Sequence, residues 1–247
     1  MPKFFVEPSK ISEEQIIIDT DDVNHILRVL RMDKGSVIDI CDSCGYDYKG
    51  EIIDVTKDKI ICSIVDKKRS NTEPKINVTL FQALPKASKM EYIIQKNVEL
   101  GINCIVPVVM SHCVSKIDNS KDSKKKTDRW QKIAEAAAKQ SGRGIIPKVC
   151  EPVSFDEAVD KLCLMDYPFA PYECEENNTL KDVIQGINGD ISVGFIIGPE
   201  GGFAKAEIDK LHDRGIKSIT LGKRILRTET AGEAVLSMIM YEADELV

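Results

Sequence analysis

The sequence predicts an α/β protein in which a helix-covered parallel sheet follows a smaller module built of strands. Strands and amphipathic helices alternate from about residue 75 to the end of the chain, which is typical of a parallel sheet with crossover helices. Segment 191–197 is apolar throughout, as a strand buried on both faces is. With 247 residues, 43% of them hydrophobic, the chain has the length of one large domain or two modest ones.

The first seventy residues contain short strand-like runs with one helical exception. Segments 37–41 and 60–65 have the composition of strands, and Gly45 and Gly50 indicate turns between them. In segment 22–30 the apolar side chains fall on one face of a helix instead. Together these features predict a small β-barrel module.

A polar stretch separates this module from the rest of the chain. Residues 66–74 hold charged and small polar side chains and end in a proline, a composition that favours a linker. We therefore expect one domain at 1–71 and a second at 74–247.

The second domain is expected to consist of alternating strands and helices with recognisable boundaries. Capping-box patterns at Ser88, Ser154 and Thr230 indicate three helix starts, and glycines after the last apolar positions indicate helix ends. The expected strands span 76–83, 102–109, 191–197 and 216–221. The expected helices span 88–100, 127–142, 154–164, 204–214 and 230 to the C-terminus.

Charge is distributed unevenly, although the whole chain is acidic. The net charge is −6, and segments 1–70, 71–148 and 149–247 carry −3, +7 and −10. A basic third between two acidic ones favours a surface that faces a polyanion. Within it, the lysine-rich run 121–129 is either a grip on phosphates or a mobile charged loop diluted by aspartates. The sequence leaves both interpretations open.

No pattern in the sequence indicates export, a membrane span or a bound metal. No segment resembles a signal peptide or the roughly 20 apolar residues of a membrane helix. The eight cysteines favour reduced thiols over a disulfide framework. Cys41 and Cys44 form the one C-x-x-C pair, whereas a zinc site needs two further ligands at matching spacing. We expect a cytoplasmic protein without a metal.

Two segments that follow predicted strands have the composition of ligand-binding loops. Segment 198–202, Gly-Pro-Glu-Gly-Gly, comes directly after the apolar strand, and segment 221–231 runs from the next strand into a helix. Ligands bind beyond the carboxyl ends of parallel strands, where glycine lets the backbone approach them. Neither the dinucleotide nor the P-loop spacing is present. In the second segment Arg227 and Glu229 flank Thr228, as a functional pair or as a surface ion pair.

These motifs and several others resemble the 16S ribosomal RNA uridine-N3 methyltransferases, a family of the SPOUT superfamily of knotted methyltransferases. The order and spacing of the shared motifs make the resemblance specific. It departs from the family at Lys3, usually arginine, and at Ala204, where a Ser or Thr cap is common. The shared motifs are Pro2-x-Phe4-Phe5-Val6, His25 to Arg31, Lys89-Met90-Glu91, Gln95 to Gly101, Trp130 to Arg143, Tyr172-Glu173, Gly198 to Phe203 and Leu221 to Ala231.

The resemblance implies a PUA-like RNA-binding β-barrel domain at 1–71, a SPOUT methyltransferase domain with a deep trefoil knot at 74–247, and a homodimer. It implies methylation of N3 of a uridine in 16S ribosomal RNA of the small ribosomal subunit, with S-adenosylmethionine as the methyl donor. The residues that it implies for the cofactor are Gly198, Pro199, Glu200, Gly201, Gly202, Leu221, Gly222, Ile225, Leu226 and Thr230. The residues that it implies for RNA are Lys3, Arg28, Arg31, Gln140 and Arg143.

The resemblance also implies roles for two residues in the chemistry. Arg227 is expected to stabilise the uracil anion or to position a phosphate. Glu229 is expected to orient Arg227 or, as the less favoured alternative, to accept the proton. N3 lies on the pairing edge, so the base must be flipped out or unpaired.

Two other functions stay open at this point. One is a SPOUT methyltransferase that acts on a ribose 2′-hydroxyl of another RNA target. The other is a non-catalytic RNA-binding assembly factor. The intact glycine segments argue against the second, because a protein that only binds RNA has no need of a cofactor site.

Overall fold

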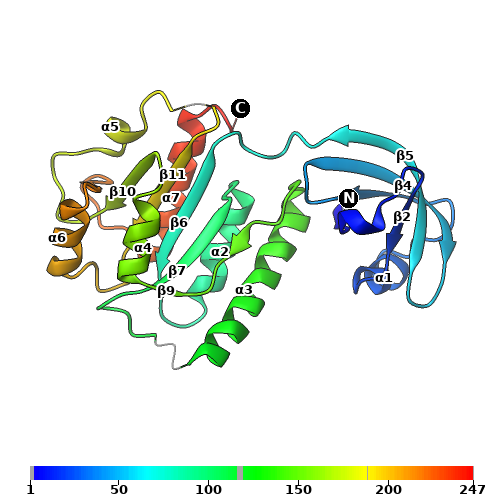
Figure 1. Ribbon diagram of the computed structural model, residues 1–247, viewed down its shortest axis with the longest axis horizontal. Helices are drawn as coiled ribbons and strands as arrows, with labels where there is room; N and C mark the ends of the chain where they lie inside the picture. Colours follow the sequence, from blue (N-terminus) through cyan, green and yellow to red (C-terminus); the bar gives the residue numbers. More distant parts are fainter. Residues whose placement is uncertain (1–2, 116–118, 188, 247) are drawn as a thin grey trace. The chain divides into compact units, whose positions relative to one another are not determined.

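The computed structural model describes residues 3–115, 119–187 and 189–246. Its contacts divide the chain into two units, Met1–Glu73 with Ala138–Ile146 and Pro74–Ala137 with Pro147–Val247. They are called unit 1 and unit 2 below, and Figure 1 shows the elements of both. Pro2, which begins the amino-terminal motif, lies outside the described residues.

Unit 1 is built on a five-stranded sheet in the order β1-β3-β4-β5-β2. β1 pairs with β3 in parallel, and the other neighbours are antiparallel. Isoleucines dominate its core, with Ile16, Ile26, Ile40 and Ile60 completely buried. The elements are β1 (Lys3–Phe5), a 3₁₀ turn (Pro8–Lys10), β2 (Gln15–Ile18), α1 (Asp22–Asn24), a π-helical turn (His25–Val29), β3 (Val37–Cys41), β4 (Tyr46–Val55) and β5 (Ile60–Arg69).

Two sequence predictions for unit 1 are wrong. Gly50 lies inside β4 rather than in a turn. The strand needs glycine at this position because a Cβ would stand 2.8 Å from Ile40 Cδ1 and 2.9 Å from Cys62 Cβ. Residues 66–69 belong to β5 rather than to a linker. Their polar side chains find partners on β4, where Lys67 Nζ lies 4.6 Å from the ring centre of Tyr46.

Residues 138–146 return to unit 1 through polar contacts that the sequence pattern does not indicate. Arg143 is only 3% exposed, and its Nη2 lies 2.5 Å from Glu73 Oε2. The backbone N–H of Gly144 also donates to Glu73, at 2.6 Å. Lys139 Nζ lies 3.0 Å from both carboxylate oxygens of Asp22. These contacts complete unit 1 with a segment distant in sequence.

Unit 2 is a parallel sheet covered by helices on both faces, so the predicted α/β class is confirmed. The strand order is β12-β10-β11-β6-β7-β8, with β9 also pairing with β7, and every pair is parallel. The strands are β6 (Asn77–Ala83), β7 (Cys104–Val109), β8 (Lys148–Val149), β9 (Val153–Ser154), β10 (Tyr167–Pro171), β11 (Ser192–Ile197) and β12 (Lys217–Ile219).

The helices of unit 2 divide between the two faces of the sheet (Figure 1). α2 packs against α7, which contacts β6 and β11, while α4 and α6 share a buried cluster on the opposite face. The helices are α2 (Lys89–Glu99), α3 (Ser120–Ser141), α4 (Phe155–Leu162), α5 (Leu180–Ile184), α6 (Lys205–Asp213) and α7 (Thr228–Glu242).

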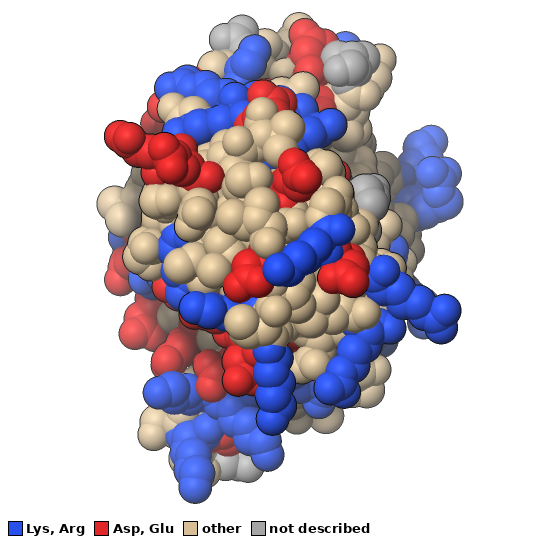
Figure 2. Space-filling model, turned by 90° about the vertical axis from the view of Figure 1, so that its right-hand side faces the viewer, with Lys and Arg blue, Asp and Glu red and all other residues tan. Residues whose placement is uncertain are grey.

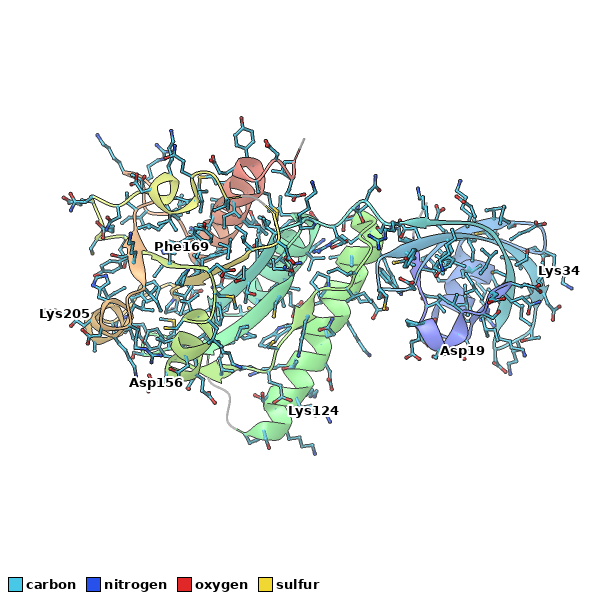
Figure 3. All side chains as sticks on the ribbon, turned by 45° about the horizontal axis from the view of Figure 1, so that its top comes forward. Asp19, Lys34, Lys124, Asp156, Phe169 and Lys205 are labelled. Atoms are coloured by element: carbon cyan, nitrogen blue, oxygen red, sulfur yellow. The ribbon has the colours of Figure 1, made fainter. Side chains whose placement is uncertain are left out.

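Strand β10 was not predicted, although it lies inside the sheet between β11 and β12. Its five residues include Pro168 and Pro171, and proline argues against a central strand because it cannot donate to the ladder. The burial of an aromatic side chain outweighs this disadvantage in β10. Phe169 is completely buried and stacks on Phe195 of β11 with ring centres 5.8 Å apart, in the middle of the layer of side chains in Figure 3.

The three predicted capping boxes have different outcomes. The box at Ser154 is confirmed, since its hydroxyl accepts from Glu157 N–H and the Glu157 carboxylate accepts from Ser154 N–H at 2.9 Å. The box at Ser88 is wrong, because Glu91 instead pairs with Arg129 at 2.5 Å. Thr230 is not a cap either, since α7 already begins at residue 228.

Helix α3 begins earlier than predicted. It starts at residue 120, and Asn119 Oδ1 accepts from the backbone N–H of Asp122 at 2.9 Å, as an N-cap does. The lysine-rich run 121–129 is therefore helical, and its interpretation as a mobile loop is wrong.

The two serines give a matched test of this capping. Ser154→Ala should lower the free energy of unfolding of unit 2 by about 1 kcal/mol, because it removes a cap hydrogen bond. Ser88→Ala, which removes no such bond, should change it by only a few tenths of that. Urea denaturation followed by the fluorescence of the single tryptophan, Trp130, measures both. Equal effects would contradict the assignment of the caps.

Candidate functional site

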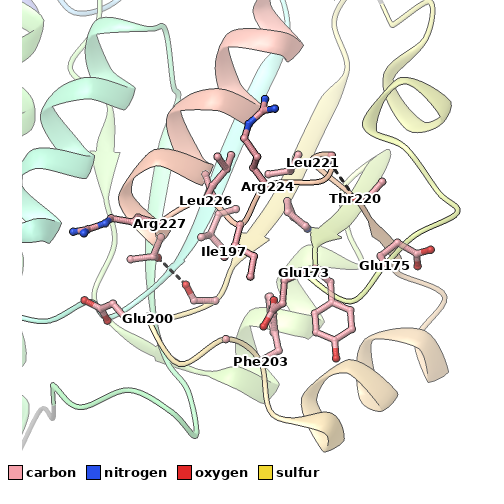
Figure 4. A pocket seen from close by; sticks show the side chains of 18 of the residues that line it. Glu173, Glu175, Ile197, Glu200, Phe203, Thr220, Leu221, Arg224, Leu226 and Arg227 are labelled. Atoms are coloured by element: carbon pink, nitrogen blue, oxygen red, sulfur yellow. Dashed lines mark hydrogen bonds between the residues drawn. The ribbon is translucent and has the colours of Figure 1, made fainter.

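A cavity of about 910 Å³ opens at the carboxyl edge of the parallel sheet. Four segments line it, and each follows a strand: residues 171–176 after β10, 197–203 after β11, 220–228 after β12, and Lys89 beyond β6. Their convergence follows from the parallel sheet, in which all carboxyl ends point the same way. Figure 4 shows their side chains around the opening. The volume lies within the range of small-molecule and cofactor sites.

The loop after β11 is shaped by glycine. Gly202 has φ +68°, and a Cβ at this position would overlap the carboxylate of Glu173 from the loop after β10. His112 contacts the same loop, with Nδ1 3.1 Å from the carbonyl oxygens of Gly201 and Gly202. A larger residue at 202 would be both strained and obstructed. The loop therefore presents bare backbone toward the cavity.

A buried hydroxyl joins this loop to the start of α7. Thr228 Oγ1 donates to the carbonyl oxygen of Gly198 at 2.7 Å and accepts from Gln82 Nε2 at 2.9 Å. Thr228 is 6% exposed and Gln82 is completely buried. Figure 4 draws the bond from Thr228 as a dashed line. One atom thus connects β6, the loop after β11 and the loop after β12.

Lys89 joins two carboxylates beside the cavity. Its Nζ lies 3.0 Å from Glu200 Oε1 and 3.1 Å from Glu229 Oε2. The hydrogen bonds to Glu200 and then to Glu229 raise the pKa of Lys89. Burial opposes ionisation of Glu200, but backbone N–H groups, including that of Lys86, and Lys89 outweigh it and lower its pKa. Both shifts favour the charged forms of Lys89 and Glu200.

Glu175 is a further carboxylate beside the cavity, and its hydrogen bonds fix the segment after β10. Ser218 Oγ donates to Glu175 Oε2 at 2.6 Å, and the backbone N–H groups of Asn177 and Asn178 donate to Oε1 at 2.9 and 3.2 Å. These hydrogen bonds, that of Ser218 first, lower the pKa of Glu175 to about 2. His212 Nε2 lies 3.1 Å from the same serine hydroxyl. The arrangement is structural, because the serine lies between its two partners and donates to the carboxylate.

Most of the residues expected to hold the cofactor line the cavity. Two do not: Gly201 contacts His112 instead, and Thr230 is exposed in the first turn of α7. The side chain of Ile225 is 85% exposed, so it contributes to the wall near its backbone. The expected residues that line the cavity are Gly198, Pro199, Glu200, Gly202, Leu221, Gly222, Ile225 and Leu226.

The two residues expected to act in the chemistry are placed differently. Arg227 lines the cavity and is exposed, and no carboxylate of the described residues lies within ion-pair distance of it. Its side chain points away from that of Arg224 in Figure 4. The carboxylate of Glu229 pairs with Lys89, so the expectation that it orients Arg227 has no support in the contacts.

The residues expected to bind RNA do not join the cavity. Arg28, Arg31 and Gln140 are exposed. Lys3 pairs with Asp47 at 2.9 Å, both side chains being nearly buried. Arg143 is buried and pairs with the partly buried carboxylate of Glu73. This is a correction, because a buried guanidinium is not displayed on the surface as a contact with RNA requires.

Several residues of the site were not predicted from the sequence. The sequence places Lys89 in a helix start and a shared motif, Gln82 in a strand and Glu173 in a shared motif, and it assigns none of these residues, nor Glu175, a role in the site. Lys89 and Glu173 carried a signal, since both follow strands of the parallel sheet and belong to shared motifs. Gln82 carried another, as an amide between the apolar residues Phe81 and Ala83 near the end of its strand.

Neither a metal cluster nor a membrane helix is found among the described residues. Within residues 3–115, 119–187 and 189–246, His, Cys, Asp and Glu side chains nowhere gather in threes that could hold a metal ion. No helix in this part of the chain has the length and apolar character needed to cross a membrane.

Comparison with known proteins adds a family to this geometry. Residues 72–240 match an RNA methyltransferase domain and residues 18–65 match an RNA methyltransferase PUA domain, which agrees with the predicted fold class. The ribosomal RNA small subunit methyltransferase E of Bacillus subtilis (strain 168) is 35% identical over 100% of this chain and 98% of its own. The protein of that name from Mesomycoplasma hyopneumoniae (strain 232) is 33% identical over 96% of this chain and 98% of its own.

A solved structure agrees with these relatives along the whole chain. It is a ribosomal RNA small subunit methyltransferase E from Neisseria gonorrhoeae bound to S-adenosyl methionine, 29% identical, with a TM-score of 0.87 and 98% of both chains covered. On these matches the chain belongs to the RNA methyltransferase family that includes the ribosomal RNA small subunit methyltransferases E.

Proposed function

We propose that this protein transfers a methyl group from S-adenosylmethionine to N3 of a uridine in 16S ribosomal RNA of the small ribosomal subunit. The observation that carries the proposal is the cavity enclosed by two glycine loops that Thr228 holds together. The relatives named for small-subunit ribosomal RNA support the substrate, and the related structure bound to S-adenosyl methionine supports the cofactor. The loops 198–202 and 221–226 are the segments proposed to form the knot.

The residues around the cavity fit this cofactor. Bare backbone at Gly198, Gly202 and Gly222 can approach an adenine edge and a ribose closely. Glu173 offers a carboxylate to hydroxyl groups and to a positive sulfonium, while Glu175 holds the segment beside it in place. When bound, S-adenosylmethionine supplies an electrophilic methyl group.

The protein's own part in the reaction is to position the base and to stabilise charge. Uracil N3 becomes a good nucleophile when its proton leaves, and the negative charge then spreads onto O2 and O4. We assign Arg227, an exposed cation at the cavity with no carboxylate partner among the described residues, to stabilise that charge. Glu229 is assigned to hold Lys89 between itself and Glu200, because its carboxylate already pairs with that ammonium group.

Outside the cavity, unit 1 is proposed to add affinity for RNA. Arg28 and Arg31 are its exposed candidates, while Lys3 and Arg143 stabilise the unit itself. A homodimer is proposed as well. Tyr92 of α2 and Tyr241 of α7 are exposed by 46% and 71% on two helices that pack together, and large exposed apolar side chains favour association. The protein is proposed to act in the cytoplasm, where its substrate is made.

The test of the function is a map of methylated nucleotides in ribosomal RNA from cells that lack the gene. We expect one uridine of 16S RNA to lose its N3-methyl group and purified protein with S-adenosylmethionine to restore it. A missing ribose 2′-O-methyl group would favour the alternative SPOUT target. Failure to bind S-adenosylmethionine in calorimetry would favour the non-catalytic assembly factor.

The link between the glycine loops has a conservative control. Thr228→Val should weaken S-adenosylmethionine binding about tenfold, because it leaves the Gly198 carbonyl and the Gln82 amide without their buried partner. Thr228→Ser keeps the hydroxyl and should stay within threefold of the wild type. Isothermal calorimetry measures both. Wild-type affinity in the valine variant would show that the link is dispensable.

The role assigned to Arg227 predicts a separation of binding from catalysis. Arg227→Ala should lower methylation at least a hundredfold while cofactor affinity stays within a few-fold, because the guanidinium acts on charge that develops on the base. Arg214→Ala is the matched control, an exposed arginine paired with Asp160 on the surface. Methyl transfer from labelled S-adenosylmethionine measures the rate. Near-normal methylation by Arg227→Ala would remove Arg227 from the catalytic residues.

A further inference from the structure

The outward side of α3 carries a row of lysines that the proposed chemistry does not use. Lys121, Lys125 and Lys132 are spaced by four and seven residues, so they project from one side of the helix, opposite the buried Trp130. Lys124 lies beside them in the first turns of α3, where Figure 3 labels it. All four lysines are exposed. They are called the α3 lysine row below.

The charge of this row is not neutralised by neighbouring carboxylates. Two other cations of α3 are paired: Lys126 with Asp122 at 2.8 Å and Arg129 with Glu91 at 2.5 Å. For the four lysines of the row, the part of the chain that the structure describes contains no carboxylate within ion-pair distance. Asp128, which is exposed, and Glu135, which is half-buried one turn beyond Lys132, are the acidic side chains on the same side of α3. At the lower end of Figure 2, at the height of the first turns of α3 in Figure 1, blue side chains outnumber red ones.

A shallow groove joins the row to α2, the helix whose first residue lines the cavity. Lys125 and Lys132 line a shallow groove between α3 and α2 that also includes Arg129 and Glu91. The pair between Arg129 and Glu91 joins α3 to the first turn of α2. Lys89, two residues before Glu91, lines the cavity. A strand whose base enters the cavity can therefore pass along α3.

We propose that the α3 lysine row binds the phosphate backbone of the RNA whose uridine enters the cavity. This inference rests on the proposed function. The row extends over the twelve residues 121–132, about 16 Å of helix, which is long enough to face several phosphates of one strand. Flexible ammonium groups without neighbouring aromatic platforms suit phosphates rather than base edges. The row therefore contributes affinity that depends on salt and not on sequence.

A charge-matched pair of variants tests the row. In the first, Lys121, Lys124, Lys125 and Lys132 are changed to Gln. In the second, Lys161, Lys181, Lys205 and Lys217, exposed lysines of unit 2 outside α3, are changed to Gln. Binding is measured between 50 and 200 mM salt with a 16-base-pair RNA duplex, with unmodified small-subunit ribosomal RNA from cells lacking the gene, and with whole small ribosomal subunits from the same cells.

The row variant should bind both RNAs at least tenfold more weakly at about 100 mM salt. The slope of log K against log salt should fall by about 2 to 3, roughly one for each phosphate that the row no longer neutralises. Its loss of activity should fall mainly on the KM for ribosomal RNA. The second variant should stay within twofold of the wild type. Unchanged Trp130 fluorescence and S-adenosylmethionine binding in both variants control for folding.

Asp128→Asn provides the opposite test, because it removes the exposed carboxylate that lies among these lysines. It should strengthen binding to the duplex about two- to threefold at low salt, and the gain should disappear at high salt. Unchanged affinity in this variant would count against the row.

Three outcomes would overturn the proposal. Equal losses in the two four-lysine variants would mean that net charge, not the row, is responsible. A wild-type slope and KM in the row variant would mean that RNA does not touch α3. A loss seen only with whole ribosomal subunits and not with naked RNA would mean that the row faces a protein. Wild-type protein that binds RNA but transfers no methyl group to uridine N3 would instead overturn the proposed function and leave the row intact.

Discussion

The candidate site depends on one buried hydroxyl. Thr228 satisfies the Gly198 carbonyl and the Gln82 amide together, and leaving such buried groups unpaired costs about 1–3 kcal/mol each. Glycine loops have few side chains with which to hold their own shape. In this site the loop after β11 is fixed by its hydrogen bond to Thr228, which is in turn bonded to Gln82 of β6. Gly232 of α7 lies against the same glutamine, 3.7 Å from Gln82 Oε1 to where its Cβ would stand, so a small residue lets the helix approach this network.

Parallel strands explain why residues from distant parts of the sequence meet at this place. Each loop of the cavity leaves the same edge of the sheet, and the helices return the chain to the other edge. The site therefore does not require contacts between residues that are close in sequence. The parallel strands also bring opposite charges together, since Lys89, after β6, pairs with Glu200, after β11. The net negative charge of the whole chain is thus compatible with a cationic side on α3, because the excess of acidic residues lies in segments 1–70 and 149–247.

The sequence was sufficient for features with a local cause and insufficient for those that depend on distant partners. The apolar strand β11, the loops after β11 and β12 and the cap at Ser154 all follow from neighbouring residues. Ser88 has the same pattern as Ser154 but forms no cap, because Arg129, far along the chain, attracts Glu91. In the sequence Arg143 stands between two glycines, and only the fold brings the carboxylate of Glu73 to it. Pro168 and Pro171 concealed β10, because burial of Phe169 outweighs their poor fit to a strand.

The return of residues 138–146 to unit 1 means that the boundary between the two units is not a point in the sequence. The chain leaves unit 1 near Pro74, re-enters it at the end of α3 and leaves again before Pro147. Cutting at residue 73 would consequently not yield two intact pieces. The larger fragment would retain the segment with Arg143, a guanidinium built to be covered and now without Glu73, and the smaller one would lack the backbone N–H groups that satisfy that carboxylate. Unit 1 is thus completed by a segment from the middle of the chain and is not a self-contained amino-terminal module.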